Sequence, residues 1–175
     1  MGVELELVYS AEQIAAAVRR LSRDISAAYC GKDICLVIVL KGAFFFAADL
    51  ARQLPLSVEM EFVRLASYRG ATTTGRVEVL LGPASPLGGR HLLVVEDIVD
   101  TGLTTRYLLD YLSAQHPASL RLCTLLNKRG RRQVPVAPDF VGLDCEDRFL
   151  VGYGLDLDER YRHLPDIHAV IGLDK

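Results

Sequence analysis

Runs of consecutive apolar residues recur along the chain. The runs at 34–40, 92–95 and 120–126 predict buried strands of a parallel sheet, because such strands are covered on both faces and need no polar side. At 58–62 apolar and acidic residues alternate instead, which predicts a strand with one wetter face, and 77–81 reads as a further strand. Between 67 and 75 the chain is polar and glycine-containing, so a loop is expected there.

Helical spacing of apolar residues separates these runs. It extends from Ile14 to Ile25, and Ser10 and Gln13 just before it have the spacing of a capping box. A second helix is expected at 43–53 and a third after Thr104. Strands that alternate with helices predict an α/β fold with an open, mainly parallel sheet and helices on both faces.

The C-terminal part of the sequence has a different pattern. Short strand patterns occur at 140–142, 149–153 and 169–171, too little to extend the sheet convincingly. We therefore expect a single domain over residues 1–175. Its core would span about 10–138, and a small cap, or hood, would combine the first few residues with about 139–175.

Composition narrows the class of protein. The chain has 175 residues, half of them apolar, and a formal net charge of −2, which favours a globular protein and argues against nucleic-acid binding. No apolar run is long enough to span a membrane, and no secretory signal is seen. Its four cysteines form no C-x-x-C pair, so we expect reduced thiols and a cytoplasmic location.

The end of the strand at 92–95 carries the most informative chemistry. Glu96, Asp97 and Asp100 follow the strand, and 100–104 forms a short loop of hydroxyl and glycine residues before a helix. Free N–H groups and the helix dipole make such a loop an anion site. Acids beside an anion site commonly contact sugar hydroxyls and Mg²⁺, or accept a proton.

This segment resembles a known signature. Residues 94–104, Val-Val-Glu-Asp-Ile-Val-Asp-Thr-Gly-Leu-Thr, resemble the phosphoribosyl pyrophosphate (PRPP) motif of the type I phosphoribosyltransferases, in the version of the hypoxanthine-guanine branch. Residues 40–42, 147–156 and 156–162 resemble other segments of the same family, in the same order. The resemblance implies the fold expected above and an enzyme of purine salvage. Such an enzyme transfers the phosphoribosyl group of PRPP to a 6-oxopurine base, giving IMP or GMP, uses Mg²⁺, and forms a homodimer or homotetramer.

The resemblance also assigns the phosphate and metal contacts. The 5′-phosphate of PRPP would be held by the loop residues Asp100, Thr101, Gly102, Leu103 and Thr104. Leu103 departs from relatives that have a polar or basic residue there, so one side-chain contact is lost.

Two further groups complete the PRPP contacts that the resemblance implies. Glu96 and Asp97 would face the ribose and Mg²⁺, and Asp156 a second Mg²⁺. Pyrophosphate would be bound by Lys41, Gly42 and Arg162, with a Leu40–Lys41 peptide bond that is often cis in the family.

The remaining roles concern the base and the reaction. Purine-binding positions would be Ile98, Lys128, Phe149, Leu150 and Asp156. Phe149 would stack on the ring, and Lys128 would donate to a 6-oxo group. Asp100 would be the catalytic proton acceptor. Ser67 and Tyr68 match the start of a mobile lid, which would exclude water from the reacting ribosyl group.

Two other functions fit parts of the sequence. One is a xanthine-preferring transferase; an adenine preference is disfavoured because Lys128 repels a 6-amino group. The other is a non-catalytic regulatory or RNA-binding protein on the same fold. It would need a basic patch, and the only clustered basic residues lie at 128–132.

Overall fold

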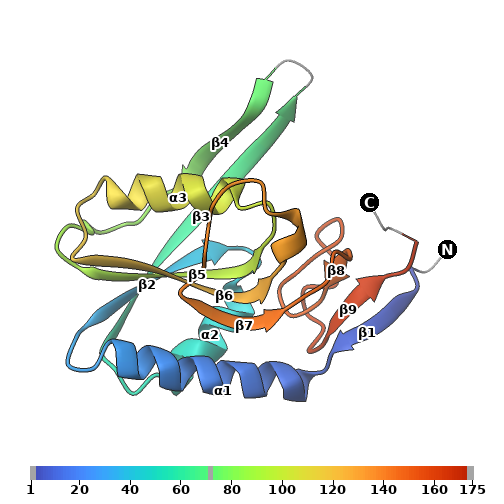
Figure 1. Ribbon diagram of the computed structural model, residues 1–175, viewed down its shortest axis with the longest axis horizontal. Coiled ribbons are helices and arrows are strands. Elements are labelled where there is room, and N and C mark those ends of the chain that lie inside the picture. The colour runs from blue at the N-terminus through green and yellow to red at the C-terminus, as the bar shows by residue number, and fades with distance from the viewer. Residues whose placement is uncertain (1–2, 71–72, 173–175) are drawn as a thin grey trace.

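A six-stranded sheet forms the centre of the molecule (Figure 1). The computed structural model describes residues 3–70 and 73–172. All neighbouring strands are parallel except the antiparallel pair β3 and β4. In spatial order the strands are β4 (Thr73–Leu81), β3 (Val58–Gly70), β2 (Ile34–Leu40), β5 (His91–Val99), β6 (Ser119–Asn127) and β7 (Phe140–Asp144). This confirms the expected open, mainly parallel sheet.

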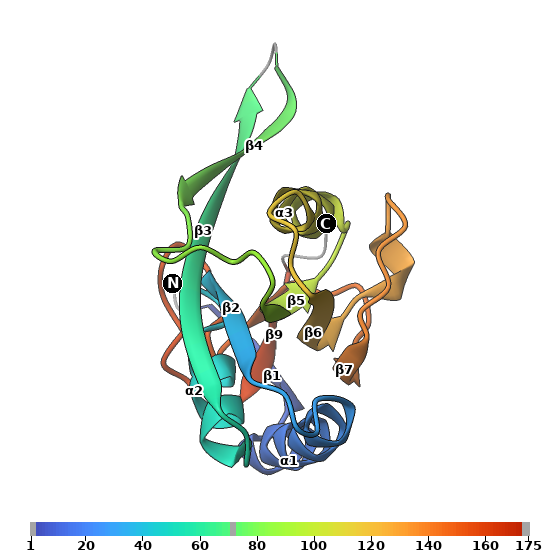
Figure 2. The ribbon, with the colours of Figure 1, turned by 90° about the vertical axis from the view of Figure 1, so that its left-hand side faces the viewer.

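Helices cover both faces of the sheet, as predicted. Helices α1 (Ala11–Ala28) and α2 (Phe44–Gln53) lie on one face, and α3 (Leu103–Ser113) lies on the other (Figures 1 and 2). Each face has its own apolar core, and the side chains of β2 and β5 alternate between the two cores. No helix among the described residues combines the length and apolar character that crossing a membrane requires.

The first helix begins where the sequence predicts. The Ser10 hydroxyl accepts a hydrogen bond from the Gln13 N–H at 3.3 Å, and the Gln13 side chain accepts one from the Ser10 N–H at 2.9 Å. This reciprocal pair satisfies N–H groups that the start of a helix leaves without partners. Ile14, Leu21 and Ile25 on the buried stripe of α1 are at most 1 % exposed.

The two chain ends form a second, smaller sheet. Its strands are antiparallel and lie in the order β1 (Leu5–Tyr9), β9 (Ile167–Val170) and β8 (Leu150–Val151). This is the expected hood. The tail differs from the expectation at one point: β7 joins the main sheet beside β6, so the tail does extend it. β7 has only five residues, with one fully buried, which left little apolar signal in the sequence. A short 3₁₀ helix, Arg129–Arg131, follows β6.

The polar segment at 67–75 is where the structure departs most from the expected loop. β3 continues to Gly70 and β4 begins at Thr73, so the segment forms the outer part of a hairpin. Tyr68 pairs with Arg76, and Gly70 with Thr73. The hairpin extends beyond the rest of the molecule (Figure 2). Residues 71–72 and the side chains at 67–76, including those of Ser67 and Tyr68, lie outside the described part.

Candidate active site

The residues singled out by the sequence converge at one edge of the main sheet. β2, β5 and β6 are neighbouring parallel strands, so their carboxyl ends lie together. Lys41 follows β2, Asp100 follows β5 and Lys128 follows β6. Ligands of open α/β sheets bind at this edge.

The loop between β5 and α3 presents backbone donors. Gly102 has a φ of 83°, a left-handed conformation that glycine adopts at little cost, and α3 begins directly after it at Leu103. The first N–H groups of a helix have no partner within the helix, so they point towards an anion placed at this end. The Leu103 N–H is 3.4 Å from the Thr101 hydroxyl, and the Leu103 side chain is 47 % exposed.

The acid pair Glu96 and Asp97 lies near the end of β5, where Glu96 has little contact with solvent. Glu96 is 7 % exposed, and its Oε2 atom has no hydrogen-bond partner in the described structure. Asp97 Oδ1 accepts a hydrogen bond from the Ile98 N–H at 2.9 Å. Burial raises the pKa of both carboxyls, and their proximity raises that of Glu96 further. A cation bound beside the two carboxylates would offset the free-energy cost of burying their negative charges.

Gly42 is a close neighbour of this pair. A Cβ added at Gly42 would lie 1.7 Å from Asp97 Oδ2, so any larger residue would displace the Asp97 carboxylate. Among the described residues, no group of three or more His, Cys, Asp and Glu side chains is arranged to enclose a metal ion. The acids suit Mg²⁺ nonetheless, because that ion keeps several waters and takes few protein ligands.

Two cations meet at the turn after β2. The Leu40–Lys41 peptide bond is cis. Lys41 Nζ lies 2.9 Å from Glu159 Oε2, and Arg162 Nη2 lies 3.3 Å from the same oxygen. Arg162 Nη2 also lies 2.8 Å from Asp156 Oδ1. The three predicted residues Lys41, Asp156 and Arg162 are therefore brought together, and Glu159 joins them.

Glycines make this convergence possible. A Cβ at Gly154 would lie 1.9 Å from the Gly42 carbonyl oxygen, so the tail backbone rests directly on the turn after β2. Arg162 Nη1 donates to the Gly154 carbonyl at 2.7 Å. The C-terminal segment thereby places Arg162 beside Lys41.

A cavity of about 360 Å³ lies beside these groups. Eight predicted residues line it: Asp97, Ile98, Asp100, Thr101, Lys128, Phe149, Leu150 and Asp156. Lys128 is 6 % exposed, and its Nζ donates to the Arg148 carbonyl at 2.7 Å. A buried ammonium beside an aromatic ring offers both a donor and a stacking surface to a flat heterocycle.

Asp100 stands between the loop and the cavity. Its side chain is 35 % exposed, yet its Oδ1 atom is buried and has no partner in the described structure. The other oxygen, Oδ2, lies 3.6 Å from Arg131 Nη1, which is also 3.5 Å from Asp147 Oδ1. One carboxylate oxygen is thus held by a cation and the other is available.

Several contributors were missed by reading the sequence. Arg131, Asp147, Arg148 and Leu155 line the cavity, and Glu159 pairs with both cations. Asp147 and Glu159 stand inside the motif segments, where no local pattern marks them. The predicted lid residues Ser67 and Tyr68 lie on β3, with their side chains outside the described part.

Known proteins resemble this chain over most of its length. The family model described as "Phosphoribosyl transferase domain" matches residues 5–158. The hypoxanthine-guanine phosphoribosyltransferase of Mycobacterium avium is 46 % identical over 165 residues, 90 % of this chain and 81 % of that protein. The hypoxanthine phosphoribosyltransferase of Escherichia coli K12 is 41 % identical over 174 residues, 98 % of each chain.

Solved structures give the same result. A Bacillus anthracis hypoxanthine-guanine phosphoribosyltransferase superposes with a TM-score of 0.91 at 37 % identity, covering 97 % of this chain and all of the other. A mutant of the Trypanosoma cruzi hypoxanthine phosphoribosyltransferase, in a ternary substrates complex, has a TM-score of 0.89 at 38 % identity, covering 96 % and 95 %.

The chain therefore belongs to the phosphoribosyltransferase family, and it is an enzyme of that class. Within the family its relatives are the hypoxanthine and hypoxanthine-guanine phosphoribosyltransferases, and its activity is that of a purine-salvage phosphoribosyltransferase.

Proposed function

We propose that the enzyme transfers the 5-phosphoribosyl group of PRPP to hypoxanthine or guanine, giving IMP or GMP and pyrophosphate. One observation carries the proposal: the cavity holding Lys128 and Phe149 opens beside the phosphate loop, with Asp100 between them. A base and a ribose phosphate bound in these two places would meet at Asp100.

The phosphate loop would hold the 5′-phosphate. The backbone N–H groups of 101–104 and the hydroxyls of Thr101 and Thr104 are the donors, and the dipole of α3 favours the negative charge. The exposed, apolar Leu103 side chain would make no polar contact with the phosphate, so this position would contribute only its backbone amide.

Lys128 would select the base. Its ammonium donates to an acceptor and cannot accept, so it favours a 6-oxo group over a 6-amino group. Phe149 would stack on the ring, Leu150 would present its backbone groups to the edge of the base, and Ile98 would line the same pocket. Asp156 would present its backbone carbonyl to the base.

Asp100 would accept the proton from N7 of the base. In the same step the bond between the anomeric carbon and pyrophosphate breaks and the bond to the base nitrogen forms. Its oxygen without a partner is the natural acceptor. A negative charge here also stabilises an oxocarbenium-like transition state.

Mg²⁺ would complete the site. Glu96 and Asp97 would hold it on the ribose side and Asp156 would hold a second ion, each with water and substrate oxygens as the remaining ligands. When bound, Mg²⁺ makes pyrophosphate a better leaving group by neutralising its charge. Lys41, Arg162 and the Gly42 backbone would bind pyrophosphate from the protein side.

The assembly and location are further parts of the proposal. A homodimer or homotetramer is supported by the exposed aromatic pair Phe44 and Phe45, which are 51 % and 39 % exposed at the start of α2. The cysteines Cys30, Cys35, Cys123 and Cys145 are free, as in proteins of a reducing compartment, which supports a cytoplasmic enzyme. Its partners would be PRPP and the base, with no nucleic acid or membrane.

A purine panel tests the function directly. The protein is incubated with PRPP, Mg²⁺ and one of hypoxanthine, guanine, xanthine or adenine, and both nucleotide and pyrophosphate are measured. We expect equal amounts of the two products with hypoxanthine and guanine. Turnover confined to xanthine or adenine, or none with any base, would refute the proposal.

A further inference from the structure

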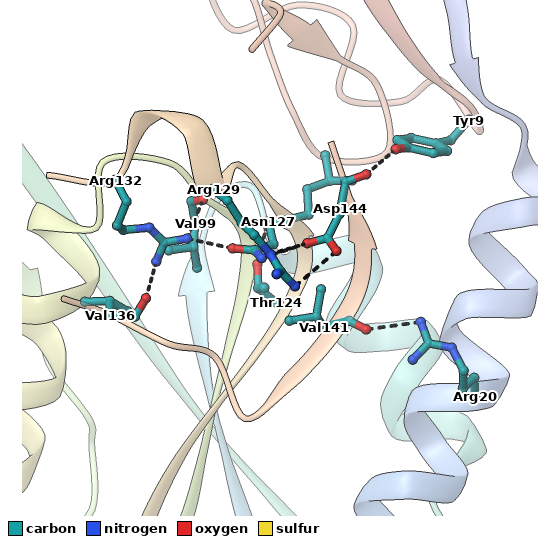
Figure 3. A network of polar contacts seen from close by, with 11 residues as sticks. Tyr9, Arg20, Val99, Thr124, Asn127, Arg129, Arg132, Val136, Val141 and Asp144 are labelled. Atoms are coloured by element: carbon teal, nitrogen blue, oxygen red, sulfur yellow. Dashed lines mark hydrogen bonds and ion pairs between the residues drawn. The ribbon is translucent and has the colours of Figure 1, made fainter. Parts of the chain in front are cut away.

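Arg132 lies directly against the phosphate loop without belonging to it (Figure 3). Its guanidinium donates to the Val99 carbonyl at 3.4 Å, to Asn127 Oδ1 at 2.6 Å and to the Val136 carbonyl at 2.6 Å. Val99 is the residue before Asp100, so one of these bonds fixes the entrance of the loop.

The same segment contacts the loop at two more places. The Gln133 N–H donates to the Thr101 carbonyl at 2.9 Å. A Cβ added at Gly102 would lie 3.0 Å from Arg132 Cδ and 3.2 Å from a methyl group of Val134. Residues 132–134 thus hold Val99, Thr101 and Gly102, and the backbone carbonyls they bind cannot turn towards the anion.

A network anchors Arg132 to the rest of the fold. Asn127, at the end of β6, is 3 % exposed and donates through Nδ2 to Asp144 Oδ1 at 2.8 Å. Tyr9 of the hood donates to the Asp144 carbonyl at 2.6 Å. Arg132 therefore connects the loop to a buried polar group rather than to a mobile surface (Figure 3).

The charge of Arg132 adds to its hydrogen bonds. A guanidinium remains protonated in proteins and offers several donors in one plane, so a single side chain can hold three acceptors. It also places a fixed positive charge behind a loop whose proposed ligand is a dianion.

We propose that Arg132 is a positioning residue for the 5′-phosphate: it fixes the loop so that the N–H groups of 101–104 point towards the phosphate. Arg132 does not contact the phosphate itself in this scheme. The proposal rests on the function proposed above, since it concerns the same loop.

Arg132→Met tests this with little change in volume. Methionine keeps an unbranched apolar stem against Gly102 but removes the donors and the charge. The KM for PRPP and the Kd for IMP should both rise by about tenfold, the scale of one to two lost hydrogen bonds. The KM for hypoxanthine should stay within about twofold, because Lys128, Phe149 and Leu150, which would bind the base, lie outside the phosphate loop. Arg132→Lys keeps the charge with fewer donors, so its KM for PRPP should lie between those of the unmodified protein and Arg132→Met.

Arg129→Met is the matched control. Arg129 is three residues away and pairs with Asp144 at 3.1 and 3.2 Å, but it makes none of the loop contacts described here. We expect its KM for PRPP to match that of the unmodified protein. Thermal unfolding of all three variants shows whether a change in KM merely reflects loss of folding, and Arg132→Lys carries the test if Arg132→Met does not fold.

Three outcomes overturn the positioning role. They are an unchanged KM for PRPP in both Arg132 variants, an equal rise in the KM for hypoxanthine, or an equal effect of Arg129→Met. Failure of the proposed function would look different, because the unmodified protein would then form no IMP at all.

Discussion

Asp100, the proposed proton acceptor, has two carboxylate oxygens in different surroundings. One oxygen lies 3.6 Å from the Arg131 guanidinium, and the other is buried without a partner among the described residues. A buried acceptor without a donor is costly in a folded protein and is expected where a ligand supplies the donor. The Arg131 guanidinium places a positive charge beside the other oxygen.

Asp100→Asn should therefore lower kcat far more than it changes the KM for PRPP. Asparagine keeps the size and the backbone of the loop but cannot accept the proton, and positioned base catalysis contributes about 10²–10⁴-fold. Steady-state kinetics of IMP formation measure both constants. Asp147→Asn is the control: it removes a carboxylate from the same Arg131 and should lower kcat much less. Near-normal turnover in Asp100→Asn would show that Asp100 is not the base.

Lys128→Ala should raise the KM for hypoxanthine and guanine by about tenfold or more. A lost charge-assisted hydrogen bond in a buried site costs about 1.5–3 kcal/mol. The KM for PRPP serves as the internal control. The difference in KM between adenine and the 6-oxopurines should become smaller, because the charge that repels a 6-amino group is gone. Unchanged KM values for both 6-oxopurines would show that Lys128 does not contact the base.

Reading the sequence identified the residues whose neighbours along the chain define them. Lys128 and Asp100 each follow an apolar run, and parallel strands bring such positions to one edge. Glu159 and Arg131 gave no such signal. The pairing of Glu159 with Lys41 and that of Arg131 with Asp100 span 118 and 31 positions and are chosen by tertiary packing. Local patterns contain no information on which distant side chain will oppose a charge.

At the scale of elements, the β3–β4 hairpin is the main difference from expectation. Its polar sequence predicted a loop, because residues 67–76 lack the alternation of apolar and polar positions that marks a strand with one buried face. Strands that pair only with each other need no apolar face, and threonine is a good strand former. β3 pairs with β2 only as far as Arg64 opposite Leu40, so the hairpin emerges beside the turn at Lys41 and Gly42.

That position predicts a ligand-dependent change in the hairpin. Amide hydrogen exchange at 67–70 and 73–76 should slow when a transition-state analogue, Mg²⁺ and pyrophosphate are added together, because closure over the site would shield these amides. Residues 92–95 of the central strand provide the control and should exchange slowly throughout. High protection without ligand, unchanged on addition, would make the hairpin a fixed feature rather than a lid.

At the scale of the whole molecule, an ion pair links the N-terminal strand of the hood to the segment that lines the cavity. Arg148, next to Phe149, makes two contacts with Glu6 of β1, at 2.9 and 2.6 Å. The Arg148 carbonyl in turn accepts from Lys128. The N-terminal strand therefore supports the segment that lines the pocket, a link that the sequence did not predict because it joins residues 142 positions apart.

Glu6→Gln should make the stability of the protein less dependent on pH. The Arg148 guanidinium holds the pKa of Glu6 below its usual 4.5, so the pair stabilises the fold above that pH and the contribution is lost as the pH falls through the lowered pKa. The variant should have a lower Tm at neutral pH, and the difference should disappear once the pH falls below the lowered pKa of Glu6. Glu4→Gln removes an equal charge nearby; if it gives the same pH profile, the pair with Arg148 is not the cause.

Glu159 is a built-in counter-ion for Lys41 and Arg162, the two cations proposed to bind pyrophosphate. Because this carboxylate is tethered between Lys41 and Arg162, any incoming anion competes with a group whose local concentration is very high. Chloride, with one charge, gains little by replacing it, whereas a pyrophosphate group has enough charge and oxygens to satisfy both cations together. We therefore expect Lys41 and Arg162 to discriminate between anions by their charge. Simple salts should be weak competitors of PRPP, although two cations lie at the mouth of the site.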